Sequence, residues 1–325
     1  MAEATAPRDV TGAEIGLAAR SKTGYQCAHQ RRLPVSETQT LTRRSFFETA
    51  AIAGALATAV RPFTPEASAQ AAAPIVTRTD VIYGRVEGSA LLANLAYPDG
   101  PGPRPAILSV HGGRWRAGNR TDASSIKVAQ WAEFGFFAMS IDYRLVGGSP
   151  APAPYVDMRC AIRWLHAHAA DYGVDPERVY LIGQSAGGHM VSMAATLGDG
   201  QYPKVGGWDQ ARSDVRGVIS VAGAYDLNTL SWGNLWTPVS GDVEEARRVA
   251  SPMTHVSAST KPTLVIHSDD DKSVPVQQAA DFVEKLKAAG VMHRYVHYTD
   301  RGHMGMTDEV IKEARAFIGE LEPKK

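Results

Sequence analysis

Residues 179–189 carry the run Val-Tyr-Leu-Ile-Gly-Gln-Ser-Ala-Gly-Gly-His, in which apolar, β-branched residues lead into Gly-x-Ser-x-Gly. Helix-forming residues then continue to Leu197. This strand–turn–helix order is typical of a nucleophile elbow, a tight turn that leaves a serine hydroxyl above the edge of a sheet. Gly183 and Gly187 lack the Cβ atoms that would collide in such a turn. We therefore predict that Ser185 is a catalytic nucleophile and that the rest of the chain supplies an acid, a base and oxyanion donors.

The composition is that of an ordinary globular protein. The chain has 325 residues, of which 44% are hydrophobic and 21% charged, and its formal net charge is zero. The absence of net charge gives no indication of nucleic acid or anionic lipid as a partner. The two cysteines are Cys27 and Cys160. Because Cys27 lies in a segment that we expect to be removed, no intrachain disulfide is expected in the mature protein.

The N-terminal region has the pattern of an export signal. Arg43-Arg44 is followed by phenylalanine, an apolar run from Thr49 to Val60, and the small residues Ala67-Ser68-Ala69. The run is shorter than the roughly 20 residues that span a membrane, so no stable membrane anchor is expected. The paired arginines resemble the bacterial twin-arginine signal, which implies the twin-arginine export machinery as a partner of the precursor. We predict that residues 1–69 are a signal peptide with a disordered n-region, and that residues 70–325 are a periplasmic or secreted enzyme.

Strands alternate with helices along the rest of the chain. Strands that are almost continuously apolar, separated by helical patterns, favour a mostly parallel sheet covered by helices on both faces. The segment 227–250 has no clear periodicity, and we interpret it as a small cap insertion in one catalytic domain. Trp115, Trp208, Trp232 and Trp236 either line a substrate pocket or pack as core. Strands are expected at 81–86, 91–97, 106–110, 136–141, 179–182, 215–222, 263–267 and 293–298, and helices at 124–134, 155–172, 189–197, 276–289 and 307–321.

The base and the acid are sought on loops after the later strands, where ligand and catalytic groups of parallel sheets gather. His303 stands on a short glycine-flanked loop after the final strand, and we predict it as the base. Asp271 begins Asp-x-x-Val-Pro, where the chain turns from a strand tip into a helix, and its carboxylate would orient that imidazole. Asp269 and Asp270 are alternatives that we interpret as turn residues. Asp226, one strand earlier, is a further alternative.

An oxyanion hole requires backbone N–H donors. One donor is predicted to be the amide of Ala186, which follows the nucleophile. The others are predicted to be the amides of Gly113 and Arg114, in the loop that His111-Gly112 begins after an earlier strand. Glycines there would let the backbone approach the substrate closely. We interpret His111 as a buried orienting residue, not a base.

Five ordered motifs resemble those of the α/β-hydrolase esterases, with hormone-sensitive-lipase-like and bacterial feruloyl or xylan esterase-like carboxylesterases as the nearest branches. The resemblance implies an α/β-hydrolase fold. The chain departs from many relatives in Gln184, where they carry Asp, Glu or His, and it lacks long N-terminal cap helices. The motifs are His111-Gly112-Gly113-x-Trp115, Asp142-Tyr143-Arg144-Leu145, Gly183-Gln184-Ser185-Ala186-Gly187-Gly188-His189, Asp271-x-x-Val274-Pro275 and Gly302-His303.

The sequence thus predicts a serine hydrolase that cleaves small-molecule carboxylic esters through an acyl-enzyme. His-Gly-Gly-x-Trp also resembles kynurenine formamidases, so amide or formamide hydrolysis is the alternative reaction. A non-catalytic binding module on the same fold is a remote alternative. No metal or cofactor is expected, because no cluster of His, Cys and Asp has ligand spacing.

Overall fold

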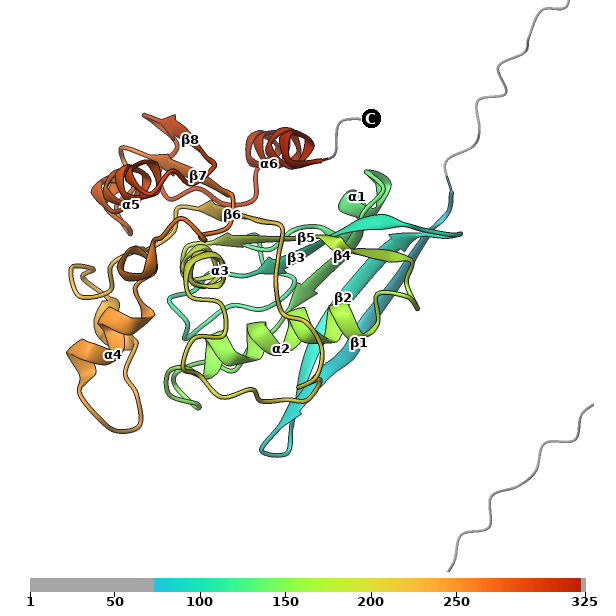
Figure 1. Cartoon of the computed structure of the whole chain (residues 1–325), viewed down its shortest axis with the longest axis horizontal. Coiled ribbons are helices and arrows are strands. Elements are labelled where there is room, and N and C mark those ends of the chain that lie inside the picture. Colours follow the sequence, from blue (N-terminus) through green and yellow to red (C-terminus); the bar gives the residue numbers. More distant parts are fainter. Residues whose placement is uncertain (1–72, 323–325) are drawn as a thin grey trace, which may run out of the picture. The chain divides into compact units, whose positions relative to one another are not determined.

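An eight-stranded sheet forms the centre of residues 73–322, which are the residues that the computed structural model describes (Figure 1). The strands are β1 (Ile75–Val86), β2 (Ser89–Pro98), β3 (Arg104–Val110), β4 (Phe137–Ile141), β5 (Val174–Gln184), β6 (Gly217–Val221), β7 (Thr263–Ser268) and β8 (His293–Tyr298). Their order in the sheet is β1-β2-β4-β3-β5-β6-β7-β8. β1 and β2 pair antiparallel, as do β2 and β4, whereas β3 to β8 run parallel.

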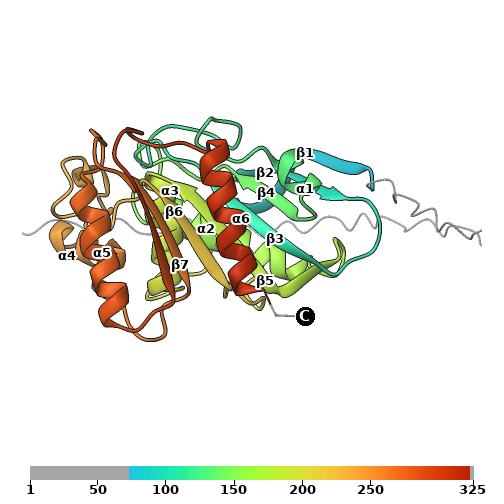
Figure 2. The same ribbon diagram turned by 90° about the horizontal axis from the view of Figure 1, so that it is seen from above.

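Helices cover both faces of this sheet. Figure 1 and Figure 2 show α1 and α6 on one face and α2 and α3 on the other. The segment 227–250, predicted as a cap, contains η1 and α4. The helices are α1 (Val128–Glu133), α2 (Ala153–Ala167), α3 (Ala186–Thr196), η1 (Gly233–Leu235), α4 (Val243–Ala250), η2 (Pro252–His255), α5 (Val276–Ala288) and α6 (Asp308–Leu321).

The two-faced core follows from the period of two along each strand. In β5, Val179 and Leu181 pack in the cluster under α2 and α3, whereas Tyr180 and Ile182 pack in the cluster under α6. All four side chains are at most 1% exposed. A strand buried on both sides must be apolar at every position, which explains its uninterrupted hydrophobic run.

The parallel register brings the motif-bearing loops to one edge. Val110 of β3 pairs with Gly183 of β5, and Gln184 pairs with Val221 of β6. β7 continues this arrangement, because Val221 pairs with Ile266. The residues that follow these strands therefore emerge at the same carboxyl edge of the sheet.

Two predicted helices are shorter than the sequence pattern suggested. The helix expected at 155–172 is α2, which ends at Ala167, where the chain turns toward β5. The helix expected at 124–134 begins only at Val128. The preceding residues are held in a loop, because Ser124 Oγ accepts a hydrogen bond from the Gly112 amide (3.0 Å) and Ser109 Oγ accepts one from the Ile126 amide (3.1 Å). These side-chain–backbone bonds compete with helical pairing.

The predictions for residues 1–69 lie outside the described residues. Within 73–322, no helix is both long enough and apolar enough to cross a lipid bilayer. Cys160 is the cysteine of this part, and it is buried as a free thiol in α2. Burial raises the pKa of this thiol to about 11, which keeps it protonated and unreactive.

Candidate active site

Ser185 lies at a strained turn between β5 and α3. Its backbone has φ 56° and ψ −117°, a conformation that costs a non-glycine residue about 1–3 kcal/mol. Its amide donates to the Val221 carbonyl (2.8 Å), and the residue is 3% exposed. A Cβ on Gly183 would collide with the Gly187 carbonyl, and one on Gly187 would collide with the Val110 carbonyl. The two glycines of Gly-x-Ser-x-Gly are therefore required by close backbone packing.

Asp271 and His303 meet at the same edge, although 32 positions separate them in the chain. The distance from His303 Nδ1 to Asp271 Oδ2 is 2.7 Å. The carboxylate is fully buried, whereas the imidazole is 29% exposed. Asp271 Oδ1 accepts from the amides of Ser273 (2.8 Å) and Val274 (2.9 Å), so the turn into α5 holds the carboxylate in place.

A second imidazole contacts the same carboxylate, and the sequence did not indicate it. His267 is the fifth residue of β7 and is completely buried. Its Nε2 lies 3.3 Å from Asp271 Oδ2 and 3.0 Å from the Val274 carbonyl. Because a carbonyl can only accept, Nε2 carries the hydrogen. Burial alone would raise the pKa of Asp271, but hydrogen bonds from His267 and His303 hold it well below its usual range.

The alternative acids occupy other positions. Asp269 Oδ1 lies 2.6 Å from Nε2 of His297, at the exposed end of β8. Asp270 Oδ1 accepts from the Gly302 amide (2.7 Å), and Asp226 Oδ1 accepts from the amide of Asn228 (3.0 Å). None of these three carboxylates contacts His303. Asp270 therefore shapes the loop that carries the imidazole, and Asp271 holds the imidazole itself.

The loop His111–Ala117, here called the oxyanion loop for its predicted role, lies against Ser185. A Cβ on Gly112 would be 3.3 Å from the Ser185 Cβ. Gly113, Arg114 and Trp115 have φ values of 103°, 55° and 60°, so the loop turns through the left-handed region. Within the described residues, the amides of Gly113, Arg114 and Ala186 donate to no protein acceptor. These three predicted donors are therefore free to bind an oxyanion.

The Gly112 carbonyl is clamped from one side. It accepts from His111 Nδ1 (2.7 Å) and from Tyr143 Oη (3.1 Å), and the two rings stack with centroids 4.0 Å apart. Burial lowers the pKa of His111, which keeps the imidazole neutral and its Nδ1 hydrogen directed at the carbonyl. In a trans peptide the C=O and the following N–H point in opposite directions. The clamp therefore directs the Gly113 amide away from His111.

Three of the four singled-out tryptophans pack together, and two of them, Trp232 and Trp236, belong to the segment 227–250. The ring of Trp115 lies 4.9 Å from that of Trp232 and 5.2 Å from that of Trp236, and all three are at most 5% exposed. Trp115 Nε1 donates to His189 Nδ1 (3.2 Å), and burial lowers the pKa of His189 to about 4. Trp208 instead donates to the Tyr83 carbonyl, on the α2 side of β1. Trp115, Trp232 and Trp236 are therefore buried packing residues, and Trp236 also lines a cavity of about 200 Å³ with Tyr202 and Val249, whereas Trp208 is 40% exposed.

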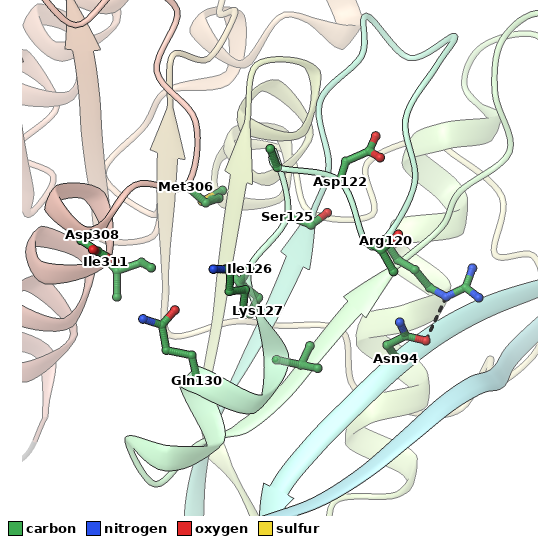
Figure 3. A pocket seen from close by; sticks show the side chains of 13 residues that line it. Asn94, Arg120, Asp122, Ser125, Ile126, Lys127, Gln130, Met306, Asp308 and Ile311 are labelled. Carbon is green, nitrogen blue, oxygen red and sulfur yellow. Dashed lines mark hydrogen bonds between the residues drawn. The ribbon is translucent and has the colours of Figure 1, made fainter.

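A pocket of about 470 Å³ lies beside the site, not over it. Figure 3 shows Arg120 and Asn94 at one end of this pocket, Met306 and Ile311 at the other, and Lys127 between them. The residues that line this pocket do not include Ser185, Asp271 or His303. The described residues also show no hydrogen bond between Ser185 Oγ and His303 Nε2, although such bonds often form only with substrate bound. Among residues 73–322, no group of three or more His, Cys, Asp or Glu could hold a metal ion.

Comparisons with known proteins agree with this architecture. The probable carboxylic ester hydrolase LipM of Mycobacterium tuberculosis is 32% identical over 198 residues, which are 57% of this chain and 46% of the relative. Esterase LipC of the same organism is 31% identical over 258 residues, 74% of this chain and 62% of the relative. This chain therefore spans between about half and three fifths of the length of these relatives.

The propionate-bound structure of esterase Est2 from Thermogutta terrifontis superposes with a TM-score of 0.65 at 25% identity, covering 77% of this chain and 97% of that one. The fold is that of the α/β-hydrolases, so the predicted fold class is confirmed. The family model described as BD-FAE matches residues 95–286. The chain belongs to the BD-FAE family.

Proposed function

We propose that this protein is a carboxylic ester hydrolase that uses Ser185, His303 and Asp271. The observation that carries the proposal is the meeting, at one sheet edge, of a strained buried serine with an aspartate-bound imidazole and a loop of free amides. The relatives LipM, LipC and Est2, whose names describe ester hydrolases or esterases, support the same reaction class.

The chemistry follows the serine-hydrolase scheme. Ser185 Oγ attacks the ester carbonyl while His303 Nε2 accepts its proton, and the imidazolium then protonates the leaving alcohol. Asp271 keeps the Nδ1 hydrogen of His303 in place and stabilises the imidazolium. The amides of Ala186, Gly113 and Arg114 bind the oxyanion, each worth a few kcal/mol in the transition state. In the second half of the reaction, His303 accepts a proton from water, which attacks the acyl-enzyme, and the carboxylic acid leaves as Ser185 is protonated again.

The first test is the hydrolysis of p-nitrophenyl acetate by Ser185→Ala. We expect kcat to fall by about 10⁴-fold or more, because no other hydroxyl stands at the elbow. Ser259→Ala is the matched control, since Ser259 is exposed and bonds only to Ser257 Oγ (2.9 Å). Full activity in Ser185→Ala would overturn the proposal. A higher kcat/KM for N-formylkynurenine than for the ester would favour the formamidase alternative.

We also propose that the precursor is exported by the twin-arginine route and acts in the periplasm or outside the cell. The support is the residue pattern of Arg43-Arg44, the short apolar run and the small residues up to Ala69. Replacing both arginines with lysine should keep the protein in the cytoplasm. The intact mass of the exported protein should place its first residue near Gln70, and an uncleaved mass would contradict the proposal.

A further inference from the structure

The side chain of Gln184 connects the elbow to the loop that carries the imidazole. Gln184 is the last residue of β5, directly before Ser185, and is 6% exposed. Its Nε2 donates to the carbonyl of Met304 at 2.9 Å, in a buried hydrogen bond. Met304 follows His303 in the segment Arg301–Gly305, here called the base loop. One side chain next to the nucleophile therefore holds the main chain next to the base.

The same amide also touches the oxyanion loop. A Cβ on Gly112 would collide with Oε1 of Gln184, so Oε1 lies directly against the Gly112 backbone. Gly112 immediately precedes Gly113, a predicted oxyanion donor. The Gln184 amide thus fills the space between the base loop and the oxyanion loop.

The contact determines which chemical group can stand at this position. A carbonyl oxygen only accepts hydrogen bonds, so the amide NH₂, not Oε1, must face Met304. A carboxylate has no hydrogen to donate, and it would place a negative charge beside the site where the oxyanion forms. A protonated carboxyl could donate, but only below its pKa. The geometry therefore requires a neutral donor.

We propose that Gln184 is a positioning residue: its uncharged amide holds the base loop and the oxyanion loop in register with Ser185. This inference rests on the proposed function, because it assigns Gln184 an effect on that reaction. Gln184 acts through its neighbours and does not itself touch the reacting atoms. In this chain the contact with the Met304 carbonyl selects a neutral donor at this position.

The test compares Gln184→Met with Gln184→Glu. Met preserves the length of the side chain without the hydrogen bond, and we expect kcat to fall about three- to tenfold with KM nearly unchanged. Glu adds a charge, and we expect a loss of about a hundredfold at pH 8. As the pH falls, the buried Glu becomes protonated and can donate to Met304. The activity of Gln184→Glu relative to the wild type should therefore rise between pH 8 and pH 5.5.

Dividing the activity of Gln184→Glu by that of the wild type at each pH cancels the pH dependence that both proteins share. The titratable groups near the amide lie on two sides. The base-loop side carries His303 and Asp271. The oxyanion-loop side carries His111, Tyr143, Asp122 and Asp142. Because these groups are identical in the wild type and in the variant, a pH-dependent ratio reports the new carboxyl. Gln184→Met has no such carboxyl group, so its activity relative to the wild type should not change with pH.

Gln278→Met is the matched control for loss of a buried amide. Gln278 is also 6% exposed, and its Nε2 donates to the Asp226 carbonyl (2.8 Å), away from the base loop. Its Oε1 also accepts from the amides of Tyr225 and Asp226, so Gln278→Met should lose at least as much stability as Gln184→Met but keep kcat. Titration with a fluorophosphonate gives the concentration of competent enzyme in each sample.

Two results would overturn the inference. One is a kcat of Gln184→Met equal to that of the wild type. The other is an activity of Gln184→Glu, relative to the wild type, that does not change with pH. Those results, combined with an inactive Ser185→Ala, would leave the proposed function intact. Activity in Ser185→Ala would instead remove the proposed function itself. If Gln184→Glu does not fold, the other two variants still test the inference. It requires a lower kcat with nearly unchanged KM in Gln184→Met and an unchanged kcat in Gln278→Met.

Discussion

Asp271, the acid of the proposed triad, is surrounded by hydrogen-bond donors. Two main-chain amides bind Oδ1, and the imidazoles of His267 and His303 both lie within 3.3 Å of Oδ2. A carboxylate surrounded by donors stays ionised even when buried, which explains its low pKa. The ionised carboxylate in turn fixes the proton of His303 on Nδ1, so that Nε2 is the nitrogen left to act as the base in the proposed reaction. His267 therefore acts on the base through the acid.

Replacing His267 with Leu should destabilise the protein in a pH-dependent way. The lost hydrogen bond to a charged group is worth about 1.5–3 kcal/mol. A carboxyl whose pKa is lowered in the folded state adds stability above its unfolded pKa of about 3.9, and that stability disappears as the pH falls through the folded value. Thermal unfolding should thus show the largest difference from the wild type at pH 6–8 and a shrinking one below about pH 4.

His267→Gln is the conservative control, because its amide can still donate to Asp271. We expect it to recover part of the lost stability and of kcat. An unfolding difference for His267→Leu that stays constant down to pH 3 would contradict the assignment of its hydrogen bond to the carboxylate.

At the scale of structural elements, the oxyanion loop combines strain with a clamp. Arg114 and Trp115 adopt left-handed backbone angles that cost L-residues about 1–2 kcal/mol each. The clamp from His111 and Tyr143 on the Gly112 carbonyl, together with the burial of Trp115, compensates for this strain. The loop is therefore pre-shaped before substrate arrives, which is the condition for strong oxyanion stabilisation.

Tyr143→Phe tests the clamp. The variant keeps the ring that stacks on His111 but loses the hydroxyl that donates to the carbonyls of His111 and Gly112, each at 3.1 Å. We expect kcat for p-nitrophenyl acetate to fall about three- to tenfold with little change in KM, because one peptide loses part of its orientation. A rise in KM at constant kcat would contradict a role in transition-state binding.

The elements were predictable where local pattern decides them. The apolar run before Ser185 and the glycines around it predicted the elbow. The loops that carry Asp271 and His303 follow the carboxyl ends of β7 and β8, where the strand pattern placed them. The contacts of His267 and Gln184 were not predictable, because they depend on how distant loops meet and on which atom carries a hydrogen. The late start of α1 had the same cause, since the hydroxyl that holds Ile126 belongs to Ser109 in β3.

Within residues 73–322, the sheet, the helices and the candidate site all belong to one compact unit. We predict that a chain beginning at Gln70 folds and hydrolyses esters as the full-length chain does. The physical reason is that every residue assigned a catalytic or positioning role here is held by contacts within 73–322. Equal kcat/KM and equal melting temperatures for the two proteins would agree with this prediction, and an inactive or unfolded short chain would contradict it.

Covalent labelling of the nucleophile tests the central claim most directly. The protein is reacted with a fluorophosphonate, and the site of the adduct is located by intact-mass measurement and peptide mapping. We predict one adduct per chain, on Ser185, absent from Ser185→Ala and formed far more slowly in His303→Gln. Labelling of a different residue, or an unchanged adduct in Ser185→Ala, would contradict the account.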